Sequence, residues 1–272
     1  MKLDTLKQIL ASFKSVLVAY SGGVDSTFLL KVAQDVLYDN IAAVTVSSPL
    51  IPACELDDAA AMTKKLSARH FLVPVDLLSI AAVSENRPDR CYWCKKEIFR
   101  NLIAFAEEQN LASVIDGTNH DDTEDYRPGL KALRELGIRS PLQESGLTKN
   151  DIRILSKEMD IPAWNKPSCA CLASRFPYGT GISEKTLKQV ACAEGFLKNL
   201  GFSQVRVRHH NDLARIEILR QEMHALLDEK TMNDIITFFN KTGYTYVTID
   251  LDGYRTGSMN EVLNDLKQTP LS

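Results

Sequence analysis

The first stretch that could do chemistry is SGGVDS, residues 21–26, which lies between two apolar runs. The preceding run, VLVA, is short and β-branched and predicts a strand buried on both faces, and the following run has helical spacing. Adjacent glycines allow a tight turn, and a helix beginning at Asp25 or Ser26 adds unpaired N–H groups and a positive dipole end. Strand, glycine turn and helix start together are typical of a phosphate site. The alternative is an ordinary strand-to-helix turn in which Asp25 or Ser26 is the N-cap.

Four of the six cysteines form two close pairs, Cys91-x-x-Cys94 and Cys169-x-Cys171. A CxxC on one turn is a usual way to present two thiolates to one metal. The four cysteines could instead close a structural zinc site, and the CxxC could be a redox dithiol. The pairs therefore predict a metal site without deciding the metal.

The elements around these residues alternate between strands and helices in the first half of the chain. Strands are expected at 16–19, 41–46, 70–76 and 112–116, and helices at 26–38, 54–68 and 95–109. Strands separated by helices of this length indicate right-handed βαβ units and a parallel sheet. Ligands of such sheets bind beyond the carboxyl ends of the strands, where residues 21–26 and 116–119 fall.

The pattern changes after about residue 175. Helices are expected at 184–200 and 231–242, and strands at 203–208, 213–218 and 244–250. Alternating strands covered by helices indicate a small α+β domain. We therefore predict an α/β domain over residues 1–175 and a smaller α+β domain over residues 176–272.

Composition excludes several classes of protein. The 272 residues are 44% hydrophobic and 25% charged, with a formal net charge of −3. No apolar run reaches the length of a membrane span, and the amphipathic N-terminal stretch is unlike a signal peptide, so we expect a cytoplasmic protein. The weakly acidic balance argues against broad nucleic-acid binding.

The hexapeptide matches the SGGxDS pyrophosphate loop (PP-loop) of the ATP pyrophosphatases, a group that includes NAD synthetase, GMP synthetase and tRNA thiolation enzymes. The wider chain resembles the LarE family, which supplies sulfur to the nickel-pincer nucleotide cofactor of lactate racemase. The resemblance lies in PDRCYWCKKEIF (88–99), DGTNHDDTEDYRPGLKALRE (116–135), SPLQESGLTKNDIR (140–153), NKPSCACLASRFPYGT (165–180), RVRHHNDLARIEI (206–218) and DLDGYRTGSMNE (250–261).

The resemblance implies a PP-loop ATP pyrophosphatase fold (adenine nucleotide alpha hydrolase-like) for the first domain. It implies that Asp25 helps hold Mg²⁺ and that ATP is the cosubstrate. The residues expected around the pyrophosphate and nucleotide are Ser21, Gly22, Gly23, Ser26, Thr118 and Asn119.

The activity implied is adenylation of the carboxylates of pyridinium-3,5-biscarboxylic acid mononucleotide, followed by their conversion to thiocarboxylates. Two sulfur sources occur in this family. In one type a single cysteine is sacrificed and becomes dehydroalanine. In the other, three cysteines hold a [4Fe–4S] cluster. The CxxC favours a cluster on Cys91, Cys94 and Cys171, with Cys169 as the alternative third ligand; either Cys169 or Cys171 could be the attacking thiolate of the sacrificial type.

Such a substrate carries a phosphate and two carboxylates, so cationic groups should converge on it. Arg206 and Arg208 alternate on an expected strand and therefore point to one face. Guanidinium groups bind phosphate in a bidentate manner. The expected substrate-phosphate residues are Ser174, Arg175, Arg206, Arg208, Glu217 and Lys95.

The alternatives are a tRNA-thiolating or amide-forming PP-loop enzyme, or a non-catalytic nucleotide-binding protein with structural zinc. The expected partner is the small-molecule mononucleotide, with neither nucleic acid nor membrane. From the resemblance we also expect a homo-oligomer and hand-over of the product to the nickel-inserting enzyme of the pathway.

Overall fold

The computed structural model describes residues 1–123, 128–167 and 169–255. The chain divides into two compact units, here called unit 1 (Met1–Val83 and Pro88–Ala170) and unit 2 (Ser84–Arg87 and the residues from Cys171). Parts of three quoted motifs, residues 124–127, 168 and 256–261, lie outside the described residues. The helices of the described ranges are all too short or too polar to cross a lipid bilayer.

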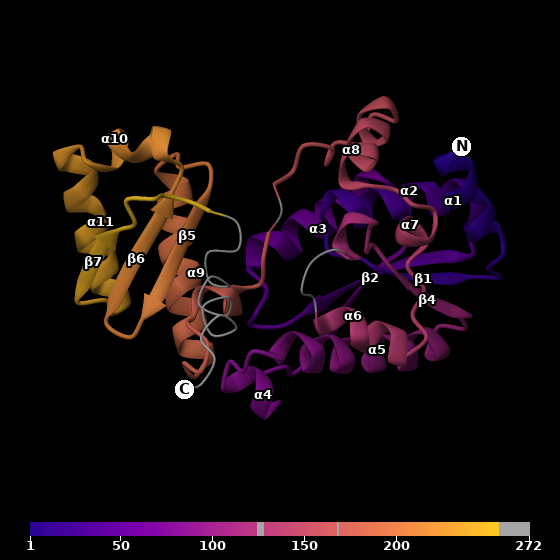
Figure 1. The fold of residues 1–272 in the computed structure, drawn as a ribbon, viewed down its shortest axis with the longest axis horizontal. Helices are drawn as coiled ribbons and strands as arrows, with labels where there is room; N and C mark the ends of the chain where they lie inside the picture. Colours follow the sequence, from indigo (N-terminus) through magenta and orange to yellow (C-terminus); the bar gives the residue numbers. More distant parts are fainter. Residues whose placement is uncertain (124–127, 168, 256–272) are drawn as a thin grey trace, which may run out of the picture. The chain divides into compact units, whose positions relative to one another are not determined.

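Unit 1 contains a four-stranded parallel sheet in the order β3-β2-β1-β4, which confirms the predicted α/β class. Helices α2 and α3 cover one face of this sheet and α5 covers the other (Figure 1). Its elements are α1 (Lys2–Ala11), β1 (Val16–Ala19), α2 (Val24–Leu37), β2 (Ile41–Ser47), α3 (Ala53–Lys65), β3 (His70–Pro74), α5 (Arg90–Glu108), β4 (Ser113–Asp116), α6 (Pro128–Glu135), α7 (Pro141–Glu144) and α8 (Lys149–Glu158), and α4 (Ala81–Ser84) follows β3.

Strand β1 lies at the centre of this sheet because its side chains are apolar on both faces. Val16, Leu17 and Val18 are each 0% exposed, as expected of a strand covered by helices on both sides. The strand pairs with β2 and β4 in parallel register, Val16 opposite Ile41 and Ser113. The turn that follows β1 is thereby held at the middle of the sheet's carboxyl edge.

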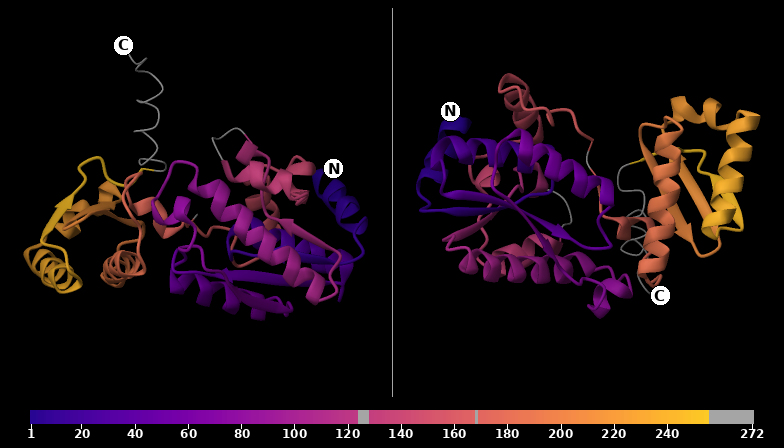
Figure 2. Two further views of the ribbon diagram at one scale, coloured as in Figure 1. Left: turned by 90° about the horizontal axis from the view of Figure 1, so that it is seen from below. Right: turned by 180° about the vertical axis from the view of Figure 1, so that it is seen from behind.

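Unit 2 has a three-stranded sheet in the order β5-β6-β7, with β5 and β6 antiparallel and β6 and β7 parallel. Helices α9 and α11 pack side by side against one face (Figure 2), where the rings of Phe196 and Phe238 stack 4.0 Å apart. The elements are η2 (Leu172–Arg175), α9 (Glu184–Asn199), β5 (Val205–His210), β6 (Leu213–Ile218), α10 (Met223–Leu226), α11 (Glu229–Thr242) and β7 (Tyr246–Ile249).

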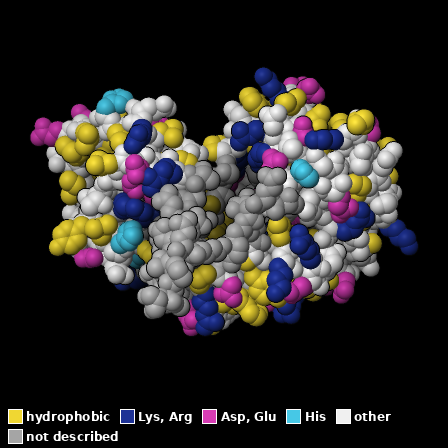
Figure 3. Space-filling model, in the orientation of Figure 1, with side chains coloured by type: hydrophobic (Ala, Val, Ile, Leu, Met, Phe, Trp, Pro, Cys, Tyr) yellow, Lys and Arg dark blue, Asp and Glu magenta, His cyan; other side chains and the backbone are white. Residues whose placement is uncertain are grey.

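The division between the units falls five residues before the predicted boundary. Arg175 is 1% exposed and forms two hydrogen bonds with Glu194 of α9, at 2.8 and 2.9 Å. This pairing ties η2 to the helix and sheet of unit 2, so residues 171–175 belong to that unit in the structure. The surface of both units mixes acidic and basic side chains on the face shown in Figure 3.

Gly22 generates a prediction about stability. Its φ is +72°, and an added Cβ would lie 3.1 Å from the Ala59 Cβ of α3. Gly137 has a similar φ of +68° but open space around it among the described residues. Gly137→Ala should therefore lower the free energy of unfolding through backbone strain alone, by about 1–2 kcal/mol. Gly22→Ala should lower it by about 1–3 kcal/mol more, because the added methyl group overpacks against α3.

We expect Gly22→Ala to lower the thermal midpoint of unit 1 by several degrees more than Gly137→Ala does. Trp93 and Trp164, the two tryptophans of the chain, both lie in unit 1, so tryptophan fluorescence follows this transition. Equal shifts in the two variants would show that the contact with Ala59 is unimportant.

Candidate functional site

The SGGVDS turn joins β1 to α2 and leaves the start of the helix without a side-chain cap. Helix α2 begins at Val24, one residue earlier than the earliest expected start. Its N-cap is Gly23, which has no side chain to cap the helix, and no other side chain does so among the described residues. The Ser21 and Ser26 hydroxyls lie 3.2 Å apart, and the Ser21 N–H donates to Ser26 Oγ at 3.3 Å. Uncapped amides and two hydroxyls at a helix start can bind an anion.

A second loop lies directly against this turn. An added Cβ at Gly117 would come within 3.1 Å of the Ser26 nitrogen, so the backbone after β4 passes the first turn of α2 closely. Thr118 and Asn119, the residues expected near the nucleotide, follow it and are 7% and 3% exposed. The structure thus places the two predicted nucleotide segments together at one edge of the sheet.

Asp116, at the end of β4, organises this second loop. Its buried carboxylate accepts hydrogen bonds from the Thr118 hydroxyl at 2.6 Å and the Ser140 hydroxyl at 2.5 Å. Lys95 Nζ lies 3.7 Å from the same carboxylate. Lys95, which the sequence assigned to the substrate phosphate, therefore faces the nucleotide loop of unit 1 from α5.

Asp25 lies in the first turn of α2 and forms an ion pair with Lys149 at the start of α8. Its Oδ1 is buried and accepts no well-formed hydrogen bond from the described residues. Burial raises the pKa of Asp25 and the charge of Asp122 raises it further, while Lys149 and the Asn119 amide partly oppose this shift. A buried carboxylate oxygen with spare capacity fits a hard cation such as Mg²⁺.

Lys149 is a residue of this site that sequence reasoning missed. A signal for its position is present, because Thr148 and Asp151 form a capping box that fixes the start of α8. Helix α8 packs against α2, and this tertiary contact brings Lys149 to Asp25.

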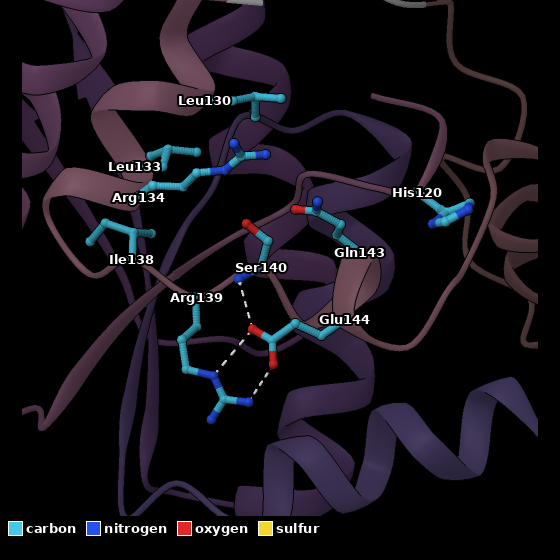
Figure 4. Close-up of a pocket in the computed structure, with 9 residues that line it drawn as sticks. All are labelled: His120, Leu130, Leu133, Arg134, Ile138, Arg139, Ser140, Gln143 and Glu144. Atoms are coloured by element: carbon cyan, nitrogen blue, oxygen red, sulfur yellow. Dashed lines mark hydrogen bonds and ion pairs between the residues drawn. The ribbon is translucent and has the colours of Figure 1, made fainter. Parts of the chain in front are cut away.

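A pocket of about 410 Å³ adjoins the second loop (Figure 4). The Gln143 N–H donates to the Thr118 carbonyl at 3.1 Å, and the pocket-lining Ser140 is the partner of Asp116. The guanidinium of Arg139 pairs with Glu144. The remaining lining residues are His120, Leu130, Leu133, Arg134 and Ile138.

Cys91 and Cys94 lie near the start of α5, which begins at Arg90, earlier than expected. A spacing of three places both on one side of the helix. All six cysteines are thiols, and Cys91, Cys169 and Cys171 are exposed. Within the described ranges no three His, Cys, Asp or Glu side chains form a group that could hold a metal.

The arginines expected at the substrate phosphate lie in unit 2, each close to a carboxylate or carbonyl. Arg208 forms two hydrogen bonds with Glu217, at 2.7 and 2.9 Å, and donates to the Ser174 carbonyl at 2.7 Å. Arg206 donates to the Val205 carbonyl and lies over the Tyr254 ring. Their binding of a phosphate stays a prediction.

Arg175 makes the densest set of these contacts. Besides Glu194, it donates to the Cys171 carbonyl at 3.1 Å and to the Ser174 hydroxyl at 2.8 Å. Glu194 Oε1 also accepts from the Val207 N–H at 2.9 Å. Glu194, which the sequence analysis did not single out, thus connects Arg175 to β5; nothing in its local sequence distinguishes it from other helical glutamates.

The comparisons with known proteins agree with this geometry. Residues 3–175 match the sequence profile described as NAD synthase. The chain is 41% identical over 270 residues to the pyridinium-3,5-bisthiocarboxylic acid mononucleotide synthase of Lactiplantibacillus plantarum, covering 96% of this chain and 95% of that protein.

Two uncharacterized proteins are also similar. One from Synechocystis is 41% identical over 262 residues, covering 96% of this chain and 98% of that protein. One from Methanocaldococcus jannaschii is 34% identical over 243 residues, covering 89% and 92%. The chain therefore belongs to the LarE family, whose nucleotide-binding part is an NAD synthase-type PP-loop domain.

Proposed function

We propose that this protein is an ATP-dependent sulfur transferase that converts the carboxylates of pyridinium-3,5-biscarboxylic acid mononucleotide to thiocarboxylates. The observation that carries the proposal is the uncapped start of α2, which lies against the Gly117 loop and beside Asp25. It is supported by the similarity to the synthase of L. plantarum, whose product is the bisthiocarboxylic acid mononucleotide.

The first step would be attack of a substrate carboxylate oxygen on the α-phosphorus of ATP, with the α–β bond breaking and pyrophosphate leaving. The amides at the start of α2 and the hydroxyls of Ser21 and Ser26 would bind the departing anion. Asp25 would hold Mg²⁺, which supplies charge neutralisation on the phosphates. Lys149 pairs with the Asp25 carboxylate, and although burial raises the pKa of Asp25, the Lys149 ammonium favours its ionised form.

In the second step sulfur displaces AMP from the acyl-adenylate. We propose a [4Fe–4S] cluster held by Cys91, Cys94 and Cys171 as the sulfur source. The i, i+3 position of Cys91 and Cys94 on α5 supports two of these ligands; the third, Cys171 or its alternative Cys169, rests on the sequence. When bound, such a cluster would supply an open iron site for hydrosulfide. Sacrifice of Cys171 or Cys169 is the competing source.

Unit 2 would hold the phosphate of the mononucleotide through Ser174, Arg175, Arg206 and Arg208, with Glu217 orienting Arg208. From the resemblance alone, we propose that the protein forms homo-oligomers and passes its product to the nickel-inserting enzyme of the pathway.

The role of Asp25 is tested by Asp25→Asn. Loss of a magnesium ligand should lower ATP-dependent pyrophosphate release at least about a hundredfold, since metal stabilisation of the charge contributes several kcal/mol. The size of the side chain is kept, so thermal unfolding should change little. Asp35→Asn, on the same helix but paired with Lys31 at the surface, is the control and should retain activity. Undiminished release by Asp25→Asn would contradict the proposed ATP site.

The Lys149 ion pair predicts a pH effect. Asp25 must be ionised to hold the metal, so activity is present above its pKa and is lost as the pH falls through it. The Lys149 ammonium lowers this pKa; Lys149→Gln should therefore move the acid limb of kcat/KM for ATP to higher pH. Lys31→Gln removes a surface lysine charge from α2 and should leave the limb in place. An unmoved limb in Lys149→Gln would mean that Asp25 does not govern it.

The sulfur source is tested on anaerobically purified protein. With a cluster, the protein should be brown, contain iron and inorganic sulfide, and turn over repeatedly when sulfide is supplied. Alanine at Cys91, Cys94 or Cys171 should abolish the cluster, because thiolates are its ligands, whereas Cys169→Ala should retain iron. Colourless protein whose mass falls by about 34 Da, the loss of H₂S from a cysteine, would establish the sacrificial source.

A further inference from the structure

Lys166 carries contacts that the proposed nucleotide and substrate sites do not use. It lies in unit 1, three residues before Cys169, and its ammonium pairs with Asp58 at 2.9 Å and with Glu55 at 3.0 Å. Both carboxylates belong to α3. The side chains of Lys166 and Glu55 are 21% and 16% exposed, so their pair is more shielded from water than an ordinary surface ion pair, whereas Asp58 is 60% exposed.

The backbone before Lys166 is fixed to the core of unit 1. Ile161 and Ala163 are 1% and 3% exposed and belong to the main core cluster. The Lys166 N–H donates to the Ala163 carbonyl at 3.0 Å. Beyond it, Pro167, Cys169 and Ala170 are exposed. Among the described residues before Cys169, Lys166 is thus the last whose side chain forms ion pairs with another element of unit 1.

Helix α3, with which Lys166 forms its ion pairs, also borders the SGGVDS turn. Ala59, the residue after Asp58, is the one that an added Cβ at Gly22 would meet. Burial raises the pKa of the hydroxyl of Tyr20, the residue before Ser21, and the hydrogen bond with Thr27 and the charge of Lys166 partly oppose this rise. That hydroxyl lies 3.2 Å from the Thr27 hydroxyl, which donates to the Gly23 carbonyl at 2.7 Å.

Lys166 stays charged under working conditions. Partial burial alone would lower the pKa of its ammonium, but the hydrogen bonds and charges of Asp58 and Glu55 outweigh burial and raise it. The ion pairs thus join Lys166 to α3, and α3 approaches the SGGVDS turn at Gly22. The residues that follow Lys166 up to Cys171 are here called the cysteine segment.

We propose that Lys166 is a positioning residue for sulfur transfer. It fixes the point where the cysteine segment leaves unit 1, near helix α3 and the SGGVDS turn. The inference rests on the proposed function, since it concerns the second step of that reaction. Without the two ion pairs, the segment would reach the acyl-adenylate less often, and the adenylate would be lost to water. Adenylation itself would continue, because the described side-chain hydrogen bonds of Ser21 and Ser26 join these residues to each other and to Gly23, and that of Asp25 is with Lys149.

The test compares Lys166→Met, Lys166→Arg and the control Lys31→Met in the full chain with ATP, Mg²⁺ and the biscarboxylic mononucleotide. We measure pyrophosphate released and thiocarboxylate formed. In Lys166→Met the thiocarboxylate formed per pyrophosphate should fall about tenfold or more, with pyrophosphate release changed less than twofold. Lys166→Arg should restore most of the ratio, and Lys31→Met should leave it unchanged.

A readout without substrate separates this inference from the proposed function. Hydrogen exchange of the amides of residues 163–166, 169 and 170 should be several-fold faster in Lys166→Met than in the parent protein, and unchanged in Lys31→Met. An unchanged ratio, unchanged exchange, or an equal loss of both activities in Lys166→Met would overturn the positioning role. A parent protein that releases no pyrophosphate would contradict the proposed function, and the exchange result would still decide whether Lys166 fastens the segment.

Discussion

The close approach of three backbone segments around the start of α2 is the constraint on which the nucleotide site depends. Gly22 brings the turn against α3, and Gly117 brings the loop after β4 against Ser26. A side chain at either glycine would push these segments apart. The approach leaves the first amides of α2 without a side-chain cap, which costs stability in the absence of a ligand and creates affinity for an anion.

Two aspartates of unit 1, Asp116 and Asp25, lie near the start of α2 and have different partners. Asp116 is satisfied by hydroxyls and has Lys95 nearby, so its carboxylate serves to hold the loop. The Oδ2 of Asp25 forms an ion pair with Lys149, whereas its Oδ1 is buried and has no well-formed hydrogen bond in the described part of the chain. Two aspartates close to the same turn thus differ in capacity for a cation, because their hydrogen-bond partners differ.

Unit 2 contains several buried or nearly buried arginines, which would be unfavourable without compensation. Glu194 and Glu217 provide it by bidentate pairing with Arg175 and Arg208. The same pairs hold the Ser174 region, since Arg175 donates to its hydroxyl and Arg208 to its carbonyl. Guanidinium groups fixed in this way are pre-oriented, a property that favours recognition of phosphate.

Much of the fold followed from the sequence by itself. The apolar, β-branched runs and the helical spacing between them determined the parallel sheet, because the period of apolar residues decides which faces are buried. SGGVDS predicted a strand-to-helix turn, which is a local property of a few consecutive residues, and the structure has this turn between β1 and α2. The helix expected from residue 95 begins already at Arg90, so the structure includes both thiols of the CxxC in α5.

Only the tertiary structure decided which distant residues meet. Lys149 reaches Asp25 across 124 positions, and Lys166 reaches Asp58 across 108. The capping box of Thr148 and Asp151 marks where α8 starts, but nothing local tells which carboxylate either lysine faces, because a lysine in a helical or loop sequence has the same pattern whichever carboxylate it faces. The unit boundary was likewise decided by Arg175 and Glu194, a pair that forms when α9 packs beside η2. Packing selects such partners by geometry, and a periodic sequence pattern carries no information about which elements will pack together.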